Sequence, residues 1–162
     1  MSLLIRKAVE EDIPSIQEIA KITWADTYDF LPEGQMEYML NWMYSDASLK
    51  EQMDKGHHFF IAELNEKSIG FASVSKEENH LFKLNKLYVL PEIQKYGVGK
   101  ALLQEVVQHV KKSEGTELQI QVNRNNTAKE FYIKHGFKVL FEADFEIGNG
   151  FYMNDYVMSL EL

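Results

Sequence analysis

The sequence contains no cysteine, which excludes disulfide bonds, thiolate catalysis and an acyl-cysteine intermediate. A chain without cysteine fits a cytoplasmic location. No apolar run approaches the length of a membrane span, so no membrane association is expected. The N-terminal stretch MSLLIRKAVEEDI is too short, and becomes acidic too soon, to be a signal peptide. The sequence therefore predicts neither a membrane protein nor a secreted one.

Linkers are also missing. Proline, glycine and serine do not gather into a flexible stretch, and no repeat or low-complexity tract interrupts the chain. Residues 1–162 are therefore expected to form a single domain, which is large enough to bury a hydrophobic core.

Basic residues are scarce: 17 Lys and Arg against 25 Asp and Glu give a net charge of −8. This balance argues against nucleic acid as a partner, because phosphate backbones require a basic surface. Residues 8–65 hold 12 acids against three lysines, a charge of −9, whereas residues 83–100 hold four lysines against one glutamate, a charge of +3. The pattern predicts a local anion site in an acidic body. For any single acid, a solvated helix face is the competing explanation.

The hydrophobic periodicity predicts an α/β (α+β) domain in the order β-α-α-β-β-β-α-β-α-β-β. We expect a mixed, mostly antiparallel sheet of about seven strands flanked by about four helices. The helices are expected from residue 13, over 34–55 with a break at YSDAS (residues 44–48), over 98–112 and over 127–135. The strands are expected at residues 4–12, 57–64, 68–75, 80–90, 117–123, 137–147 and 151–162.

Three helix ends carry capping signals. Asp12 precedes Pro14 as a candidate N-cap, Thr127 and Glu130 have the spacing of a capping box, and Gly115 stands where the third helical region can end. Hairpin turns are predicted at Asn65-Glu66-Lys67 and Gly148-Asn149-Gly150.

The segment QKYGVGKALL, residues 94–103, joins a predicted strand to an apolar-striped helix through Gly97 and Gly99. Glycines allow close approach of the backbone, and a helix N-terminus presents free N–H groups and a positive dipole end, so a phosphate is the expected ligand. A P-loop is excluded because only one residue separates the glycines and Ala101 follows Lys100. A dinucleotide fingerprint is excluded because Leu102 occupies the place of its third small residue.

Two motifs together carry a family resemblance. LYVLPEIQKYGVGKALLQ is followed by NRNNTAKEFYIKHGF, and the pair resembles the GNAT superfamily of acyl-CoA-dependent N-acetyltransferases over about residues 81–140. TWADTY near the N-terminus and FYMNDYVMSLEL at the C-terminus are similar to the bacterial subgroup that includes polyamine N-acetyltransferases. The matching positions are Gln94, Gly97 and Gly99, then Asn125, Ala128, Phe131, Tyr132, Gly136 and Phe137.

The resemblance implies acetyl-CoA as the co-substrate and no metal. The pyrophosphate is expected on the amides of residues 95–100, and the pantetheine arm on the backbone of residues 87–89, as an added strand. His57 and His58 lack cysteine partners and helical metal spacing, so they are not predicted to bind a metal. The expected cofactor-binding residues are Leu87, Tyr88, Val89, Gln94, Lys95, Tyr96, Gly97, Val98, Gly99, Lys100, Asn125 and Tyr132.

Tyr132 matches the family's tyrosine that donates a proton to the departing thiolate; a half-buried core tyrosine is the alternative. The general base is not assigned. Asn85 stands where many relatives carry a carboxylate, which leaves His80, Glu77 or Glu78 acting through water, or a water chain alone.

The acceptor is expected to be a small cationic amine, such as a polyamine, held by Trp24, Asp26 and Tyr28 through charge and ring faces. For Trp24, helix packing is an equal alternative. A protein N-terminus or lysine as acceptor, a non-catalytic acyl-CoA-binding module and a homodimer all remain open.

Overall fold

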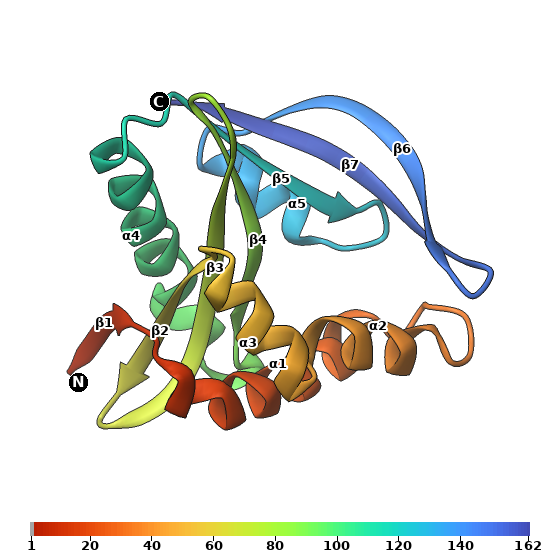
Figure 1. Cartoon of the computed structure of the whole chain (residues 1–162), viewed down its shortest axis with the longest axis horizontal. Coiled ribbons are helices and arrows are strands. Elements are labelled where there is room, and N and C mark those ends of the chain that lie inside the picture. The colour runs from red at the N-terminus through yellow and green to blue at the C-terminus, as the bar shows by residue number, and fades with distance from the viewer. Residues whose placement is uncertain (1) are drawn as a thin grey trace.

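A computed structural model describes residues 2–162, which fold around one seven-stranded sheet (Figure 1). The strand order is β1-β2-β3-β4-β5-β7-β6, and every neighbouring pair is antiparallel except β4 and β5. The predicted mixed, mostly antiparallel sheet is confirmed. The strands are β1 (Leu3–Lys7), β2 (His58–Leu64), β3 (Lys67–Glu78), β4 (Leu81–Val89), β5 (Glu117–Asn123), β6 (Lys138–Gly148) and β7 (Phe151–Glu161).

Within residues 2–162, five α-helices cover the sheet where about four were predicted, because the region 34–55 divides at Ser45 into two helices. The Ser45 hydroxyl accepts a hydrogen bond from the Ser48 N–H at 3.2 Å and caps the second of them. Helices α1 to α3 lie on one face of the sheet, and α4 and α5 on the other (Figure 1). The helices are α1 (Ile13–Thr27), α2 (Gln35–Tyr44), α3 (Asp46–Asp54), α4 (Val98–Lys112) and α5 (Ala128–Lys134), with 3-10 turns η1 (Glu10–Asp12) and η2 (Pro91–Tyr96).

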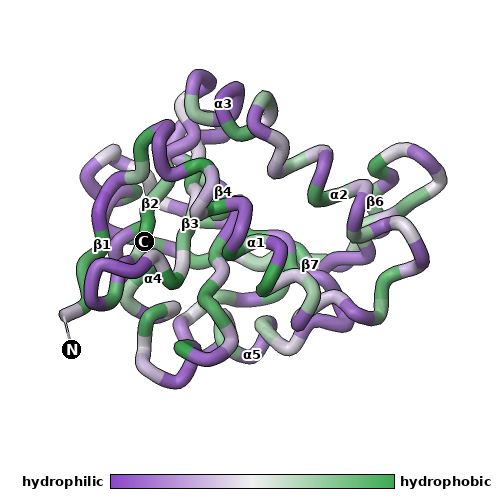
Figure 2. Tube along the Cα trace, turned by 90° about the horizontal axis from the view of Figure 1, so that it is seen from below, coloured by the Kyte–Doolittle hydropathy of each residue, from purple (hydrophilic) through white to green (hydrophobic). Residues whose placement is uncertain are grey.

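The core lies between the sheet and the apolar stripe of each helix. Hydrophobic and hydrophilic positions alternate around the helices (Figure 2), and α4 buries Val98, Leu102, Val106 and Val110 on one side. Burial of each such side chain stabilises the fold by about 1.5–3 kcal/mol. Within residues 2–162, none of the helices combines the length and the hydrophobicity needed to cross a membrane.

Asp12 and Thr127 occupy the N-cap positions of α1 and α5, as predicted, but neither side chain makes the capping hydrogen bond. The Asp12 carboxylate does not cap α1; it accepts from the Val9 N–H at 2.8 Å and pairs with Arg6, so β1 ends at Lys7 and η1 follows. Thr127 makes no side-chain cap for α5. Asn126 takes that role, because its side-chain oxygen accepts from the Ala128 N–H at 2.9 Å.

Gly115 ends α4, although not through a left-handed backbone. Its N–H donates to the Val110 carbonyl at 2.8 Å, whereas Glu114 is the residue with positive φ, at 63°. A Cβ on Gly115 would lie 2.3 Å from the Val110 side chain and 2.7 Å from that of Phe82. Glycine is therefore required here by the close approach of the helix end to β4.

Both predicted hairpins are present, and each turn has two residues. Asn65 and Glu66 have φ of 52° and 69°, and Asn149 and Gly150 have φ of 54° and 76°. Positive φ at both central residues is the mark of a type I′ turn, which matches the twist of the paired strands.

Strand β4 contains a bulge that matters for the site. Ser73 of β3 pairs with Lys86, but the next residue, Val74, pairs with Leu84, so Asn85 is an extra residue on β4. The bulge reverses the alternation of side chains along the strand. Before it, Phe82 faces the end of α4; after it, Lys86 reaches α3 on the opposite face.

Candidate active site

A cleft of about 670 Å³ opens where β4 and β5 separate. The two strands pair only between residues 81–83 and 117–119, although β4 continues to Val89 and β5 to Asn123. The cleft is walled by the C-terminal end of α1, the second half of β4, the N-terminal end of α4 and the start of α5. One side of β4 is therefore free of a partner strand along the cleft.

The N-terminal end of α4 closes one end of this cleft. Gly97 has φ of 74° and precedes the helix, and the first intrahelical bond runs from the Ala101 N–H to the Gly97 carbonyl at 3.1 Å. The amides of Val98, Gly99 and Lys100 precede that bond, so they belong to the free donors of the helix N-terminus. This geometry suits an anion.

Most of the predicted site residues are brought together around the cleft. Those that line it are Asp26, Tyr28, Leu87, Tyr88, Val89, Gln94, Gly97, Gly99, Lys100, Asn125 and Tyr132. The Gln94 side chain donates to the Val89 carbonyl at 3.1 Å, so it links η2 to the end of β4.

Four predicted residues do not line the cleft. Lys95 and Tyr96 are exposed on η2, and the Val98 side chain is buried in the core below α4. Trp24 is buried and packs against the rings of Tyr28 and Tyr88, with centroids 4.8 and 6.1 Å away. Of the two interpretations of Trp24, helix packing describes its position.

Tyr132 lies in the wall of the cleft, and only 4% of its surface is exposed. Its ring packs edge-on against Phe131 and Phe137. Burial, together with the neighbouring Tyr28 hydroxyl, raises the pKa of Tyr132 well above its ordinary value. The phenol therefore remains protonated at neutral pH and can donate a hydrogen bond into the cleft.

A short chain of hydrogen bonds crosses the cleft between α1, β4 and the loop before α5. The Tyr28 and Tyr88 hydroxyls lie 3.1 Å apart, and the Asn126 amide donates to the Tyr28 hydroxyl at 3.3 Å. Burial raises the pKa of both tyrosines, so both stay neutral. The chain fixes the Tyr28 ring opposite β4.

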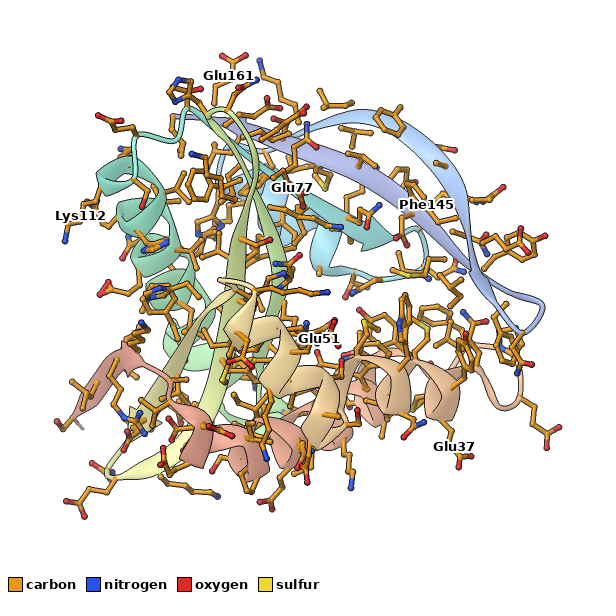
Figure 3. The ribbon with its side chains drawn as sticks, viewed as in Figure 1. Glu37, Glu51, Glu77, Lys112, Phe145 and Glu161 are labelled. Atoms are coloured by element: carbon orange, nitrogen blue, oxygen red, sulfur yellow. The ribbon has the colours of Figure 1, made fainter. Side chains whose placement is uncertain are left out.

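The acidic segment 8–65 contributes little charge to the cleft itself. Of its 12 acids, Asp26 and Asp29 line the cleft. Glu37 on α2 points away from the sheet (Figure 3), and Glu51 on α3 is exposed and pairs with Lys55. For these two acids, the solvated helix face is the correct explanation.

The predicted basic segment 83–100 is also divided. Lys100 lies at the glycines, but Lys83 and Lys86 lie on the face of β4 that looks toward α3 and the β6–β7 hairpin. Lys86 lines the cleft, is 7% exposed and donates to the Gln52 side-chain oxygen at 2.7 Å. Desolvation and the charge of Lys83 lower the pKa of Lys86 to about 8.

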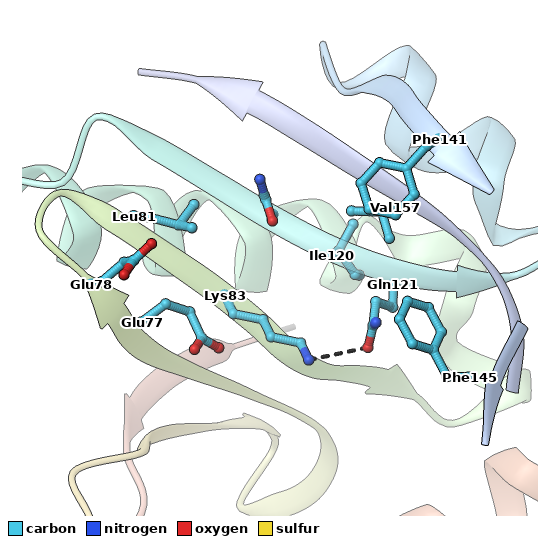
Figure 4. A pocket seen from close by; sticks show the side chains of 10 residues that line it. Glu77, Glu78, Leu81, Lys83, Ile120, Gln121, Phe141, Phe145 and Val157 are labelled. Carbon is cyan, nitrogen blue, oxygen red and sulfur yellow. Dashed lines mark hydrogen bonds between the residues drawn. The ribbon is translucent and has the colours of Figure 1, made fainter. Parts of the chain in front are cut away.

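A second hollow of about 390 Å³ lies on the same face, between the ends of β3 and β4 and the β6–β7 hairpin (Figure 4). Lys83 donates to the Gln121 side-chain oxygen there at 3.1 Å, and Glu77 and Glu78 stand at its rim. Gln121 belongs to both the hollow and the cleft. The two spaces therefore meet on the α3 side of the sheet.

The carboxylates and histidine considered as bases are not in the cleft. Glu77 and Glu78 line the second hollow, and His80, in the β3–β4 turn, bonds the Glu114 carbonyl at 2.8 Å. Asn85 does line the cleft, but its amide donates to the Ser75 hydroxyl at 2.9 Å. Asp155 is buried on β7, with one carboxyl oxygen unpartnered among residues 2–162, and burial raises its pKa to about 6.

Reasoning from the sequence missed several polar residues of the cleft, Lys86 and Asn126 among them. The only signal for Lys86 was its place in FKLNKLYV, where strict alternation puts it on the same face as Phe82 and Leu84; the bulge at Asn85 reverses this. Asn126 was not predicted because the capping-box spacing favoured Thr127, although Asn is as good a cap as Thr.

Comparisons with known proteins agree with this geometry. A family model described as acetyltransferase (GNAT) domain matches residues 27–160. The chain is 32% identical over 148 residues to the spermidine N(1)-acetyltransferase of Thermoplasma acidophilum, which covers 86% of this chain and 90% of that protein. The crystal structure of the PaiA N-acetyltransferase of T. acidophilum in complex with coenzyme A superposes with a TM-score of 0.85 and 30% identity, covering both chains completely.

The fold also matches more distant proteins. The crystal structure of the ribosomal-protein-S18-alanine N-acetyltransferase of Escherichia coli has a TM-score of 0.75 at 20% identity, and covers 99% of this chain and 94% of that one. At this identity the likeness concerns the fold alone. The chain thus belongs to the GNAT acetyltransferases. It is an acetyl-CoA-dependent N-acetyltransferase.

Proposed function

We propose that this enzyme transfers the acetyl group of acetyl-CoA to a primary amine of a small cation of the polyamine class, by direct attack through a tetrahedral intermediate. The observation that carries the proposal is the cleft between β4 and β5, which has a helix N-terminus at one end and a buried phenol in its wall. The experiment that tests it is an amine-panel assay that follows thiol release from acetyl-CoA.

The pyrophosphate of acetyl-CoA is proposed to lie on the amides of residues 95–100, those of Val98, Gly99 and Lys100 being the free donors of α4. The Lys95 and Lys100 side chains add positive charge from the surface. Hydrogen bonds to phosphate from a helix N-terminus need no particular side chains, which is why two glycines suffice there. Asn125 lines the same cleft and is proposed to bond the cofactor beyond its pyrophosphate.

The pantetheine arm is proposed to run along Leu87, Tyr88 and Val89, on the side of β4 that lacks a partner strand. An extended chain with amides can add to a free strand edge through main-chain hydrogen bonds. This direction leads the thioester from the α4 end of the cleft toward Tyr132 and Tyr28.

The reaction requires an oxyanion donor and a proton for the departing sulfur. A backbone N–H around Tyr88–Val89 is proposed to stabilise the oxyanion. Tyr132 is proposed to donate to the sulfur as negative charge develops on it; its protonated state at neutral pH supports this role.

The acceptor is proposed to enter past Asp26 and Tyr28, which line the cleft beside the α1 end. Asp26 and Asp29 supply negative charge there, and the ring of Tyr28 supplies a face for a cation. The spermidine-acetylating relative from T. acidophilum supports a polyamine at 32% identity.

Charge attraction makes a salt dependence the expected result. Polyamines should outperform neutral and acidic amines, and their KM should rise with ionic strength, because salt screens the attraction to Asp26 and Asp29. Initial rates over a range of NaCl concentrations, with acetyl-CoA saturating, measure this. Equal activity toward acidic amines, or turnover of peptides alone, would contradict the small-cation proposal.

A further inference from the structure

We propose that Lys86, in its neutral form, accepts the proton that the acceptor's ammonium must lose before it attacks the thioester. The inference rests on the N-acetyl transfer proposed above. It supplies a base in a cleft that carries Asn85 where many GNAT enzymes carry a carboxylate.

The position of Lys86 follows from the bulge at Asn85. The extra residue turns Lys86 onto the face of β4 that looks toward α1 and α3, where it lines the cleft together with Tyr88, two residues further on. Tyr88 bonds Tyr28 on this face. Lys86 therefore stands on the acceptor side of the strand along which the pantetheine arm is proposed to lie.

The side chain of Lys86 is held in one orientation. Its Nζ donates to the Gln52 side-chain oxygen at 2.7 Å. The Gln52 amide nitrogen, in turn, donates to the Met43 carbonyl at 2.9 Å and to the Ser48 hydroxyl at 3.0 Å. These two bonds fix which end of the Gln52 amide faces Lys86, so Gln52 on α3 presents its oxygen as an acceptor. One N–H of Lys86 is used in this bond, and the nitrogen lone pair of the neutral amine stays free.

The surroundings of Lys86 favour its neutral form. No acidic side chain of residues 2–162 forms an ion pair with it. Its Nζ lies over the ring of Tyr44, 5.4 Å from the ring centre, and over that of Phe59, at 5.6 Å. These ring faces attract the cation, but they replace neither a counterion nor the water lost on burial. Burial of a cation without a counterion is costly, which is why desolvation lowers its pKa to about 8.

Among the ionisable groups around Lys86, one cation acts on its pKa. Lys83, on the same strand, lowers the pKa of Lys86. His57, before β2, has its own pKa lowered by burial and then by Lys86, and Glu77 on β3 acts on His57 in the opposite sense. Tyr44 on α2 is buried and stays neutral because its pKa is raised. Lys86 is thus charged below about pH 8 and available as a base above it.

The protons balance without another reactant. The acceptor R–NH₃⁺ passes one proton to the neutral Lys86 and becomes R–NH₂, whose lone pair forms the C–N bond to the thioester carbon. The tetrahedral intermediate then collapses: the C–S bond breaks, the sulfur receives a proton as the new amide nitrogen loses its second one, and CoA–SH leaves. Lys86 returns its proton to water, so the sum is amide, CoA–SH and one H⁺.

The test compares Lys86→Met with the unaltered enzyme on two acceptors that differ in basicity. One is spermidine, and the other is spermidine with two fluorine atoms on the carbon β to the terminal nitrogen that is acetylated. Methionine keeps the length and removes the base. With spermidine, kcat should fall by about 10²- to 10⁴-fold without a rise in the KM for spermidine. The fluorinated amine is largely neutral at the assay pH, so its kcat should fall far less. A structural defect would lower both equally.

Two further measurements fix the assignment. In the unaltered enzyme, kcat should fall as the pH drops through about 8, because Lys86 becomes charged, and this limb should vanish in Lys86→Met. Lys83→Met serves as the matched control: the loss of a neighbouring positive charge raises the pKa of Lys86, so the limb should move to higher pH while the plateau remains. Removal of a buried cation should also raise the Tm of Lys86→Met at pH 7, and this gain should shrink toward pH 10.

Several outcomes would overturn the proposal. Equal losses on the two amines, or no loss on either, would exclude Lys86 as the base while leaving the acetyltransferase activity in place. A rise in KM confined to acceptors with a carboxylate would make Lys86 an anion-binding residue instead. A limb near pH 6 that vanishes in Asp155→Asn and persists in Lys86→Met would assign the base to Asp155. If spermidine and every other amine fail with the unaltered enzyme, the proposed function itself fails.

Discussion

Replacement of Tyr132 by phenylalanine is expected to lower kcat by about 10²- to 10⁴-fold, the usual loss when a general acid is removed. The substitution keeps a ring that packs against Phe131 and Phe137 and deletes only the hydroxyl. The KM for acetyl-CoA and the Tm should therefore change little. Steady-state rates of thiol release at saturating acetyl-CoA measure the effect, because the loss belongs to the transition state.

An activated acyl donor is the matched control for this variant. An aryl thioester releases an aryl thiolate, which needs no proton because the pKa of its thiol is low. With such a donor, Tyr132→Phe should therefore recover most of its rate. Near-normal kcat on acetyl-CoA would leave Tyr132 as a core residue only. Loss of both catalysis and CoA binding would point instead to a structural role.

Replacement of Gly99 by glutamate is expected to abolish CoA binding. Gly99 lies in the first turn of α4 and lines the cleft, where the backbone is proposed to approach the pyrophosphate. Glutamate would place a bulky anion against an anionic ligand. Isothermal titration calorimetry with CoA measures the loss, and an affinity equal to that of the unaltered enzyme would show that the phosphates bind elsewhere.

Gly99→Ala separates size from charge at the same position. A Cβ on Gly99 would lie 3.6 Å from the Phe131 ring and 4.0 Å from the Leu87 side chain, which are ordinary contacts. Alanine should therefore fold normally and retain most of the affinity for CoA. The same variant also reports on the helix, since alanine is the better helix former.

Local patterns were sufficient to predict most of the fold. These patterns depend on residues close in sequence. They are the apolar stripe of α4, the type I′ turns and the motifs around Gly97 and Tyr132, and each favours one local structure. The family's motifs occupy the ends of neighbouring elements, so the resemblance placed most, though not all, of the predicted residues at the cleft.

The remaining features depend on contacts that no short stretch contains. Asp12 looks like a cap until Arg6 approaches it from the end of β1. In the sequence, Gly115 is typical of a left-handed helix end. In the structure, glycine is needed there because Phe82, from β4, lies beside it. The bulge at Asn85 is defined by the register with β3, so the burial of Lys86 could not be read from FKLNKLYV.

Because β4 and β5 separate early, the sheet consists of two blocks of strands. A block of four strands, β1 to β4, and a block of three, β5 to β7, are joined across the sheet by three residue pairs at one end. The cleft lies between the two blocks, and the hydrogen bonds from Tyr88 through Tyr28 to Asn126 cross it. A cofactor that lies along β4 and is bonded to Asn125 would contact both blocks and connect them. Arrival of acetyl-CoA would then slow hydrogen exchange along residues 84–89 and restrain the β6–β7 arm before any amine binds.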